Sequence, residues 1–169
     1  QNLLEKDPQI REQIIVATKG GFIPFDIDSG MEPLEFFQNR FLETGILSEK
    51  DIVMGYHSLK PEFIRECVLI SLENLGLDYI DIYYIHNPEL QLSEISQDEF
   101  YNRLSKAFDV LQGFVKEGRI RMYGTATWDG YRLDIDDPGK ISFKRVVEAA
   151  ESTVAGAHHH FRVIQLPIN

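Results

Sequence analysis

A chain of 169 residues is long enough for a single domain with a buried core, and 43% hydrophobic with 26% charged residues is a globular composition. Its 17 Lys and Arg against 27 Asp and Glu give a formal net charge of −10, and an acidic surface repels phosphate, so we expect no nucleic-acid partner. No apolar run approaches the roughly 20 residues of a membrane span, residues 1–12 lack the apolar core of a signal peptide, and the lone Cys67 cannot form an internal disulfide, which together predict a cytoplasmic protein.

Four short apolar runs rich in β-branched and aromatic residues predict buried strands of a parallel sheet. In chain order they are residues 14–18 (IIVAT), 79–85 (YIDIYYI), 120–127 (IRMYGTAT) and 163–168 (VIQLPI). Lys19 directly follows the first run, and His86 directly follows the second. Pro167 would remove one ladder donor near the end of the fourth strand.

Amphipathic patterns between these runs predict three helices. They cover residues 61–75, the stretch from Ser96 to Gly118, and residues 142–154. Ser96 and Glu99 have the spacing of a capping box, and Gly76 and Gly118 are placed to end the first two helices. The apolar positions of the first helix include Cys67, which we therefore expect in the core.

Residues 22–60 separate the first strand from the first helix and show neither a strand nor a helix period. Their aromatic and aliphatic residues predict that this segment folds as an insertion with elements of its own, because structureless loops of such length are uncommon. His57, near its end, is expected at the surface. The triplet at 158–160 (HHH) has no carboxylate or cysteine arrangement beside it, so we interpret it as a solvated linker and predict no metal site.

Alternating strands and helices predict parallel βαβ units in one α/β domain over residues 1–169. Four such units do not close a sheet of eight strands, and the first and last strands would be unpaired edges. The chain is therefore either an open, doubly wound sheet of the flavodoxin type or a piece of a barrel.

Lys19 and His86 stand at the C-terminal ends of two successive strands, where catalytic groups of a βα barrel converge. An ammonium group can stabilise negative charge that develops on a carbonyl oxygen, and a neutral imidazole can orient the carbonyl. The pair is therefore suited to proton donation to a carbonyl compound. In the alternative interpretation, Lys19 is a solvated lysine and His86 a hydrogen-bonded turn residue.

Four segments resemble, in the correct order, the third to sixth barrel strands of the aldo-keto reductase family. They are residues 14–21 (IIVATKGG), 71–89 (SLENLGLDYIDIYYIHNPE), 111–128 (LQGFVKEGRIRMYGTATW) and 163–169 (VIQLPIN). The second is the most specific, since it follows the family signature Ser-Leu-x-x-Leu-Gly-x-Asp-Tyr-Ile-Asp-Leu-Tyr-x-x-His. The resemblance implies a (β/α)8 TIM barrel, of which this chain covers roughly strands three to six.

The resemblance also implies an activity, the NADPH-dependent reduction of an aldehyde or ketone to an alcohol. The family uses a tyrosine as proton donor with an aspartate, a lysine and a histidine around it. By that analogy Lys19 tunes the tyrosine and His86 orients the carbonyl of a small-molecule substrate. The implied contacts to NADP(H) come from Gln165, Thr127 and Asn169. Asn87 and Trp128 lie on loops at the C-terminal ends of the strands, where they either line a substrate pocket or simply cover the mouth of the barrel.

Two departures from the family pattern affect these expectations. The Ser-Asn pair that holds the nicotinamide carboxamide is replaced by Ala126 and Thr127, and the alanine side chain cannot form a hydrogen bond. This favours the alternative function, a non-enzymatic binding or regulatory subunit. The family's aspartate and tyrosine lie before its third strand, and residues 1–13 offer no counterpart, so we expect the 169-residue chain alone to be inactive.

Overall fold

The computed structural model of the protein describes residues 9–25, 30–156 and 158–168. These residues form one four-stranded, fully parallel sheet with the strands in chain order. The strands are β1 (Ala17–Gly20), β2 (Ile80–His86), β3 (Ile120–Ala126) and β4 (Phe161–Gln165). The alternating order expected from the sequence is confirmed.

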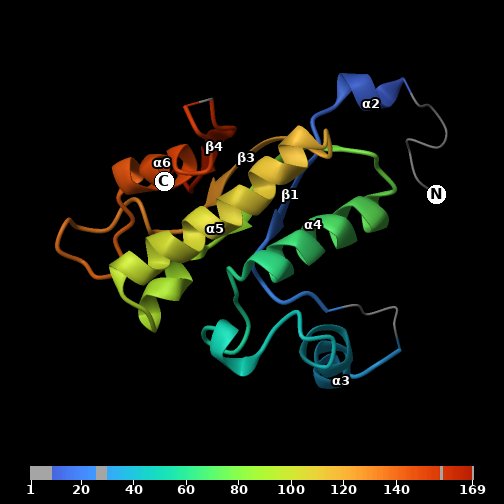
Figure 1. Cartoon of the computed structure of the whole chain (residues 1–169), viewed down its shortest axis with the longest axis horizontal. Coiled ribbons are helices and arrows are strands. Elements are labelled where there is room, and N and C mark those ends of the chain that lie inside the picture. The colour runs from blue at the N-terminus through green and yellow to red at the C-terminus, as the bar shows by residue number, and fades with distance from the viewer. Residues whose placement is uncertain (1–8, 26–29, 157, 169) are drawn as a thin grey trace.

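Three helices lie together on one face of this sheet (Figure 1). They are α4 (Pro61–Leu75), α5 (Gln97–Lys116) and α6 (Phe143–Glu151). A short helix, α2 (Ile10–Gln13), precedes β1, and the turn η4 (Pro88–Ser93) follows β2. In the described parts of the chain, no helix combines the length and the apolarity that a bilayer span needs.

Local signals set the helix ends. Pro61 occupies the first turn of α4, where a missing N–H has no cost, and Gly76 ends the helix with a left-handed φ of 62°. At the start of α5 the Ser96 hydroxyl accepts a bond from the Glu99 N–H at 3.3 Å. The capping box is nevertheless only half formed, because the Glu99 carboxylate accepts from Arg103 Nε at 2.8 Å instead.

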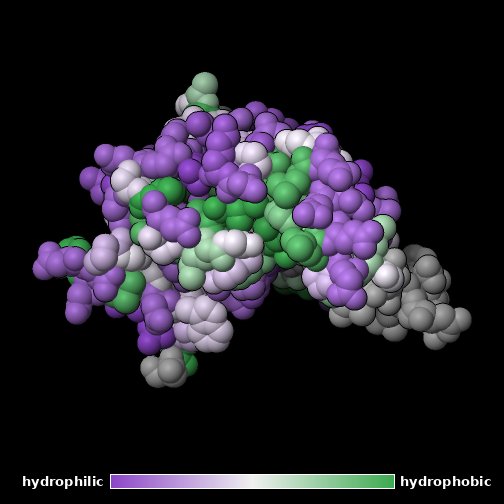
Figure 2. All heavy atoms as spheres, turned by 90° about the horizontal axis from the view of Figure 1, so that it is seen from below, coloured by the Kyte–Doolittle hydropathy of each residue, from purple (hydrophilic) through white to green (hydrophobic). Residues whose placement is uncertain are grey.

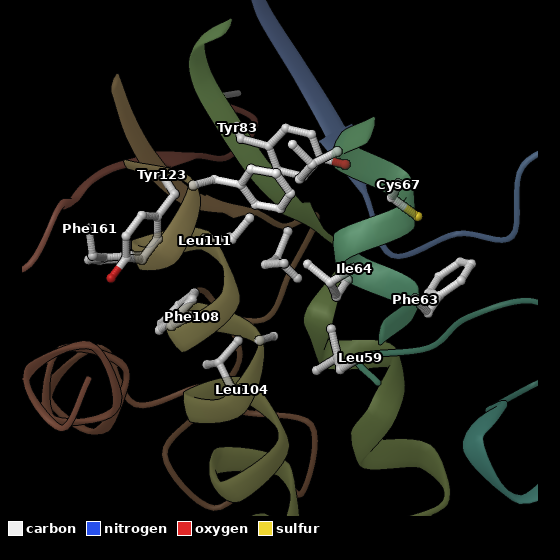
Figure 3. Close-up of a cluster of buried hydrophobic side chains, with 14 of the residues drawn as sticks. Leu59, Phe63, Ile64, Cys67, Tyr83, Leu104, Phe108, Leu111, Tyr123 and Phe161 are labelled. Carbon is white, nitrogen blue, oxygen red and sulfur yellow. The ribbon is translucent and has the colours of Figure 1, made fainter. Parts of the chain in front are cut away.

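The core lies between the helices and the sheet. Figure 3 shows aromatic rings of the strands facing aliphatic and aromatic side chains of α4 and α5. Tyr83 and Tyr123 are fully buried, as are Ile64 and Phe108. Cys67 is 6% exposed and belongs to this core, as expected. Each such side chain contributes about 1.5–3 kcal/mol by leaving water, so this layer fixes the sheet on the helices.

The other face of the sheet has no covering layer among the described residues. Ala17, Lys19 and Gln165 are exposed, and His86 is only half-buried. The strands, expected to be buried, are therefore covered on the helix side alone in the part of the chain that the structure describes. The first strand also begins later than expected, at Ala17, and leaves Ile15 76% exposed. Apolar residues of a run are buried only where a second layer meets them.

The segment 22–60 folds on elements of its own in its described part. It contains α3 (Pro33–Phe37), a π-helical turn η2 (Gln38–Leu42) and a 3-10 turn η3 (Glu49–Asp51). The Phe41 ring packs against Phe63 of α4 with centroids 5.4 Å apart, and Leu47 and Leu59 are buried beside it. The segment is therefore anchored to the core.

At the N-terminal end of the sheet, one acidic side chain joins several partners. The Asp81 carboxylate is 2.8 Å from an Arg11 nitrogen and 3.1 Å from an Arg121 nitrogen, and it accepts the Val16 N–H at 2.9 Å. Both guanidinium groups also lie over the ring of Tyr79, at 3.9 and 4.5 Å. This cluster ties α2, β2 and β3 together.

Candidate active site

A cleft of about 270 Å³ opens at the C-terminal ends of the strands. Its walls are Lys19, His86, Asn87, Ala126, Thr127, Trp128, Gln165, Leu166 and Pro167. Figure 2 views the molecule from the side on which the chain leaves β1 toward α3, and hydrophobic residues gather in the middle of that face. The walls of the cleft themselves combine apolar side chains, such as Leu166 and Pro167, with polar ones, as ligand sites commonly do.

The strand register explains why these residues meet. His86 pairs with Ala126, and Ala126 pairs with Gln165. Lys19 pairs with Tyr84, which lies two residues before His86 and therefore on the same side of the strand. Lys19, His86 and Gln165 thus line one cleft on the uncovered face, as expected from their positions at strand ends. Their roles in catalysis and cofactor binding stay predictions.

The surroundings of His86 favour the neutral form of its ring. Burial lowers the pKa of its imidazole below the ordinary value, and the nearby Lys19 ammonium lowers that pKa further. The ring of Phe22 packs edge-on against it with centroids 4.7 Å apart. A neutral imidazole carries one N–H donor and one acceptor nitrogen, which is the form that can bind a carbonyl oxygen without carrying charge.

His57, expected at the surface, is completely buried beside this site. Its Nε2 lies 2.8 Å from the carbonyl oxygen of His86, and its Nδ1 lies 2.9 Å from the amide nitrogen of Gln91. Burial lowers the pKa of His57 to about 4. The expectation was wrong because these contacts join residues 29 and 34 positions apart, and no local period in the segment 22–60 reports them.

Thr127 presents a buried hydroxyl that has no hydrogen-bond partner among the described residues. The residue is 5% exposed, and its backbone N–H donates to the Gln165 carbonyl at 2.9 Å. A buried hydroxyl without a partner costs free energy, which a ligand with a polar group could recover. Thr127 and Gln165 both line the cleft, as does Ala126, whose side chain can form no hydrogen bond; the predicted contacts of Thr127 and Gln165 to a nicotinamide carboxamide stay predictions.

The two residues proposed for a substrate pocket both line the cleft. Asn87 has a left-handed φ of 43°, and its N–H donates to the Ala126 carbonyl at 2.7 Å. Trp128 is 65% exposed, and its N–H donates to the carboxylate of Glu89 at 2.9 Å. Burial raises the pKa of that carboxyl, while backbone N–H groups of the loop after β3 partly offset this.

Residues around β4 follow strand alternation only as far as the strand lasts. Ile164 lines a second cavity of about 620 Å³ on the helix side, with Tyr131, as alternation requires. Strand alternation continued past Gln165 would point Leu166 toward the helices, but Leu166 lines the cleft instead, because β4 ends at Gln165 and the alternation ends with it. Asn169 lies outside the described residues.

Two further points bear on the chemistry of this end of the molecule. No described tyrosine lines the cleft, so a proton donor of that type is not among its walls. Within the described ranges no three histidine, cysteine or acidic side chains are grouped to hold a metal ion. In the histidine triplet, His160 bonds to Gln112 at 3.0 Å and His159 lies 3.4 Å from Arg162.

Comparison with known proteins identifies the family. The model of the aldo/keto reductase family matches residues 1–135. An NADH-specific methylglyoxal reductase of Escherichia coli K12 is 34% identical over 119 residues, which cover 70% of this chain and 29% of that protein. A 6-dehydroglucose reductase of Novosphingobium aromaticivorans is 24% identical over 129 residues, 75% of this chain and 29% of that protein. The chain belongs to the aldo/keto reductase family.

A solved structure agrees on the fold. The glycerol dehydrogenase of Gluconobacter oxydans superposes with a TM-score of 0.51 at 19% identity, over 93% of this chain and 33% of that one. At that identity the likeness shows the fold alone. The parallel sheet is thus part of the TIM barrel of this family, which rejects the open flavodoxin-type sheet. The chain spans 29% of the length of the E. coli relative.

Proposed function

We propose that this chain contributes Lys19 and His86 to an oxidoreductase that reduces an aldehyde or ketone to an alcohol with NADPH. The observation that carries the proposal is the shared cleft of the two side chains, in which Lys19 helps to keep His86 neutral. The family match supports it.

The residues have separate tasks in this reaction. The neutral His86 ring donates a hydrogen bond to the substrate carbonyl oxygen and so orients the carbonyl. The Lys19 ammonium stabilises the negative charge that grows on that oxygen. A bound reduced nicotinamide would supply the hydride, and the proton that completes the alcohol would come from the tyrosine that the family uses, which is not among the described walls of the cleft. Asn87 and Trp128 line the space for the rest of the substrate.

The coenzyme contacts proposed on this chain come from β3, β4 and the residues that follow them. The buried Thr127 hydroxyl and the Gln165 amide would hold the nicotinamide carboxamide, with Asn169 as a third proposed contact. A hydroxyl that already lacks a partner gains a hydrogen bond on binding without losing one. The coenzyme itself is open to test, because the E. coli relative is named as NADH-specific.

An assay of coenzyme oxidation tests the proposal. NADPH and NADH are each offered with a panel of aldehydes and ketones that includes methylglyoxal, to the whole protein and to the 169-residue chain. The whole protein should turn over with one coenzyme, and the isolated chain should be silent. Losing a positioned acid–base group costs about 10²–10⁴-fold, so Lys19→Met and His86→Gln should lose at least about 10²-fold.

Matched control variants separate chemistry from stability. Lys144→Met removes an 85% exposed lysine of α6, and His160→Gln removes a histidine that bonds to Gln112 away from the cleft. Both should keep wild-type turnover. If Lys19→Met or His86→Gln also keeps it, the proposed roles are wrong.

Ala126 favours the second candidate function, a binding or regulatory subunit without turnover. Coenzyme fluorescence distinguishes the two functions. Saturable binding of NADPH or NADH by the whole protein, without oxidation by any carbonyl compound, would select the subunit. Binding with turnover would select the reductase.

A further inference from the structure

From the contacts around His86, we infer that His57 is a positioning residue that fixes the peptide group following His86 through a one-way chain of hydrogen bonds. The inference rests on the proposed function only for the importance of His86. The contacts themselves are independent of any reaction.

The direction of the chain follows from its outermost member. Arg103 can only donate, and its guanidinium bonds to the Glu99 carboxylate at 2.8 Å and to the side-chain oxygen of Gln91 at 3.1 Å. The amide nitrogen of Gln91 must therefore point the other way, toward His57. An amide NH₂ is a donor, so the nitrogen of His57 that it meets has to be an acceptor.

This fixes the tautomer of His57. With Nδ1 accepting from Gln91, the proton of the neutral ring sits on Nε2 and is donated to the carbonyl oxygen of His86 at 2.8 Å. A second proton would place an N–H against the Gln91 amide, which opposes protonation in addition to burial. Each polar atom in this series of hydrogen bonds thus acts either as a donor or as an acceptor, without conflict.

The His86 carbonyl, which accepts the hydrogen bond from His57, lies where the ladder between β1 and β2 has already ended. The last pair between β1 and β2 is Gly20 with Ile85, one residue before His86. The chain then turns away at Gly21, whose φ is 124°. A Cβ at Gly21 would come within 2.9 Å of His57 Nε2 and 3.2 Å of the His86 oxygen, so only glycine permits the ring to enter.

The same peptide group is held from its other side. Its N–H, which belongs to Asn87, donates to the Ala126 carbonyl of β3 at 2.7 Å. The peptide group is therefore hydrogen-bonded on one side by His57, which belongs to the segment 22–60, and on the other side by β3. Phe22 of the same segment packs on the rings of both His57 and His86, with centroids 5.3 and 4.7 Å away. The segment thereby controls where the His86 ring lies.

Nuclear magnetic resonance on the 169-residue chain tests the inference without any turnover. The histidine ring nitrogens should show His57 with its proton on Nε2 from pH 5.5 to 8. A proton on Nδ1 would overturn the inference outright.

Three variants then test the effect on the peptide group. His57→Leu should speed hydrogen exchange of the Asn87 N–H by about tenfold, the usual effect of losing one hydrogen bond. It should also move the His86 ring signals. His57→Gln keeps a donor and should restore both measurements. His160→Leu, the matched control, removes a histidine that also bonds to a glutamine and should change neither.

Each remaining outcome has a meaning. Unchanged Asn87 exchange and His86 signals in a folded His57→Leu would refute the positioning role. If that variant does not fold, Gln91→Met replaces it, because it removes the hydrogen bond that holds Nδ1 of the His57 ring. The His86 carbonyl should still keep the proton of His57 on Nε2, and the loosened ring should speed exchange of the Asn87 N–H. Unchanged Asn87 exchange in Gln91→Met would overturn the inference. Loss of the proposed reductase activity would leave these results untouched.

Discussion

The two ends of the sheet use polar side chains in opposite ways. At the N-terminal end, Asp81 meets two guanidinium groups and a backbone N–H, so the buried carboxylate has partners on both oxygens. At the C-terminal end, Lys19 and Gln165 are exposed on the open face, and the buried Thr127 hydroxyl has no partner in the described structure. The first end stabilises the fold, whereas the second leaves the side chains of Lys19 and Gln165 exposed in the cleft.

His57 shows how the second end is nevertheless kept in order. Its hydrogen bonds lie behind the cleft, on the His86 backbone, and leave the His86 ring free. Rigid support from a buried shell with a free functional group in front is what an active site requires.

The largest effect expected is at the N-terminal end. Asp81→Ala leaves two guanidinium groups beside Tyr79 without their carboxylate, and breaking a buried ion pair costs about 3–5 kcal/mol. Urea unfolding should therefore show a loss of about 3 kcal/mol. Asp78→Ala, at an exposed aspartate three residues earlier, should stay within about 0.5 kcal/mol of the wild type. If both variants lose the same free energy of unfolding, the cluster around Asp81 does not stabilise the fold.

Acid should weaken the C-terminal end through His57. The pKa of His57 is about 4 in the folded chain against an ordinary 6.5. Between these pH values His57 is therefore protonated in the unfolded chain but neutral in the folded chain. Stability is full above pH 6.5, falls as the pH drops toward 4, and levels off below. One pKa unit corresponds to about 1.4 kcal/mol, which gives a loss of about 2 kcal/mol between pH 7.5 and 5.

Unfolding at the two pH values, in wild type and His57→Gln, isolates that contribution. The variant should lose about 2 kcal/mol less than the wild type over this interval. His160→Gln serves as the control and should keep the wild-type slope. The same pH slope in His57→Gln as in the wild type would show that His57 is not buried in neutral form.

Two threonines near the end of β3 differ in whether their hydroxyls have a partner. The Thr125 hydroxyl is 2.7 Å from the Tyr131 hydroxyl, whereas the Thr127 hydroxyl has no described partner. Thr125→Val should therefore cost about 1 kcal/mol of stability, and Thr127→Val should be neutral or slightly stabilising. The affinity for the coenzyme should change the other way round: Thr127→Val should lower it, and Thr125→Val should leave it nearly unchanged. A stability cost in Thr127→Val like that of Thr125→Val would mean that its hydroxyl already has a partner in the protein.

Much of the fold could be predicted because its signals are local. The bounds of α4 were predicted to the residue, since Pro61 and Gly76 mark its two ends. The second and third strands were placed within one residue, because each apolar run ends at a polar residue or a turn. Strand ends in a parallel sheet share one edge, which is why Lys19, His86 and Gln165 could be placed in one cleft.

What failed depends on contacts between distant parts of the chain. Ile15 has the apolarity of a strand residue, but its burial would need a second layer over β1. His57 has no neighbouring signal, because its partners His86 and Gln91 come from β2 and the turn after it. Leu166 follows the alternation in the sequence but lies beyond the last ladder pair.

The smallest expected effect shows whether Lys19 and His86 form one site at the C-terminal end of the sheet. The measurement is the pKa of His86, from the titration of its ring signals in the 169-residue chain and in Lys19→Met. The wild-type pKa should lie below the ordinary value of 6.5. Removing the ammonium should raise this pKa without restoring it fully, because burial is the larger cause. The control Lys144→Met should leave the pKa unchanged. An identical His86 pKa in wild type and Lys19→Met would mean that the two groups do not share a cleft.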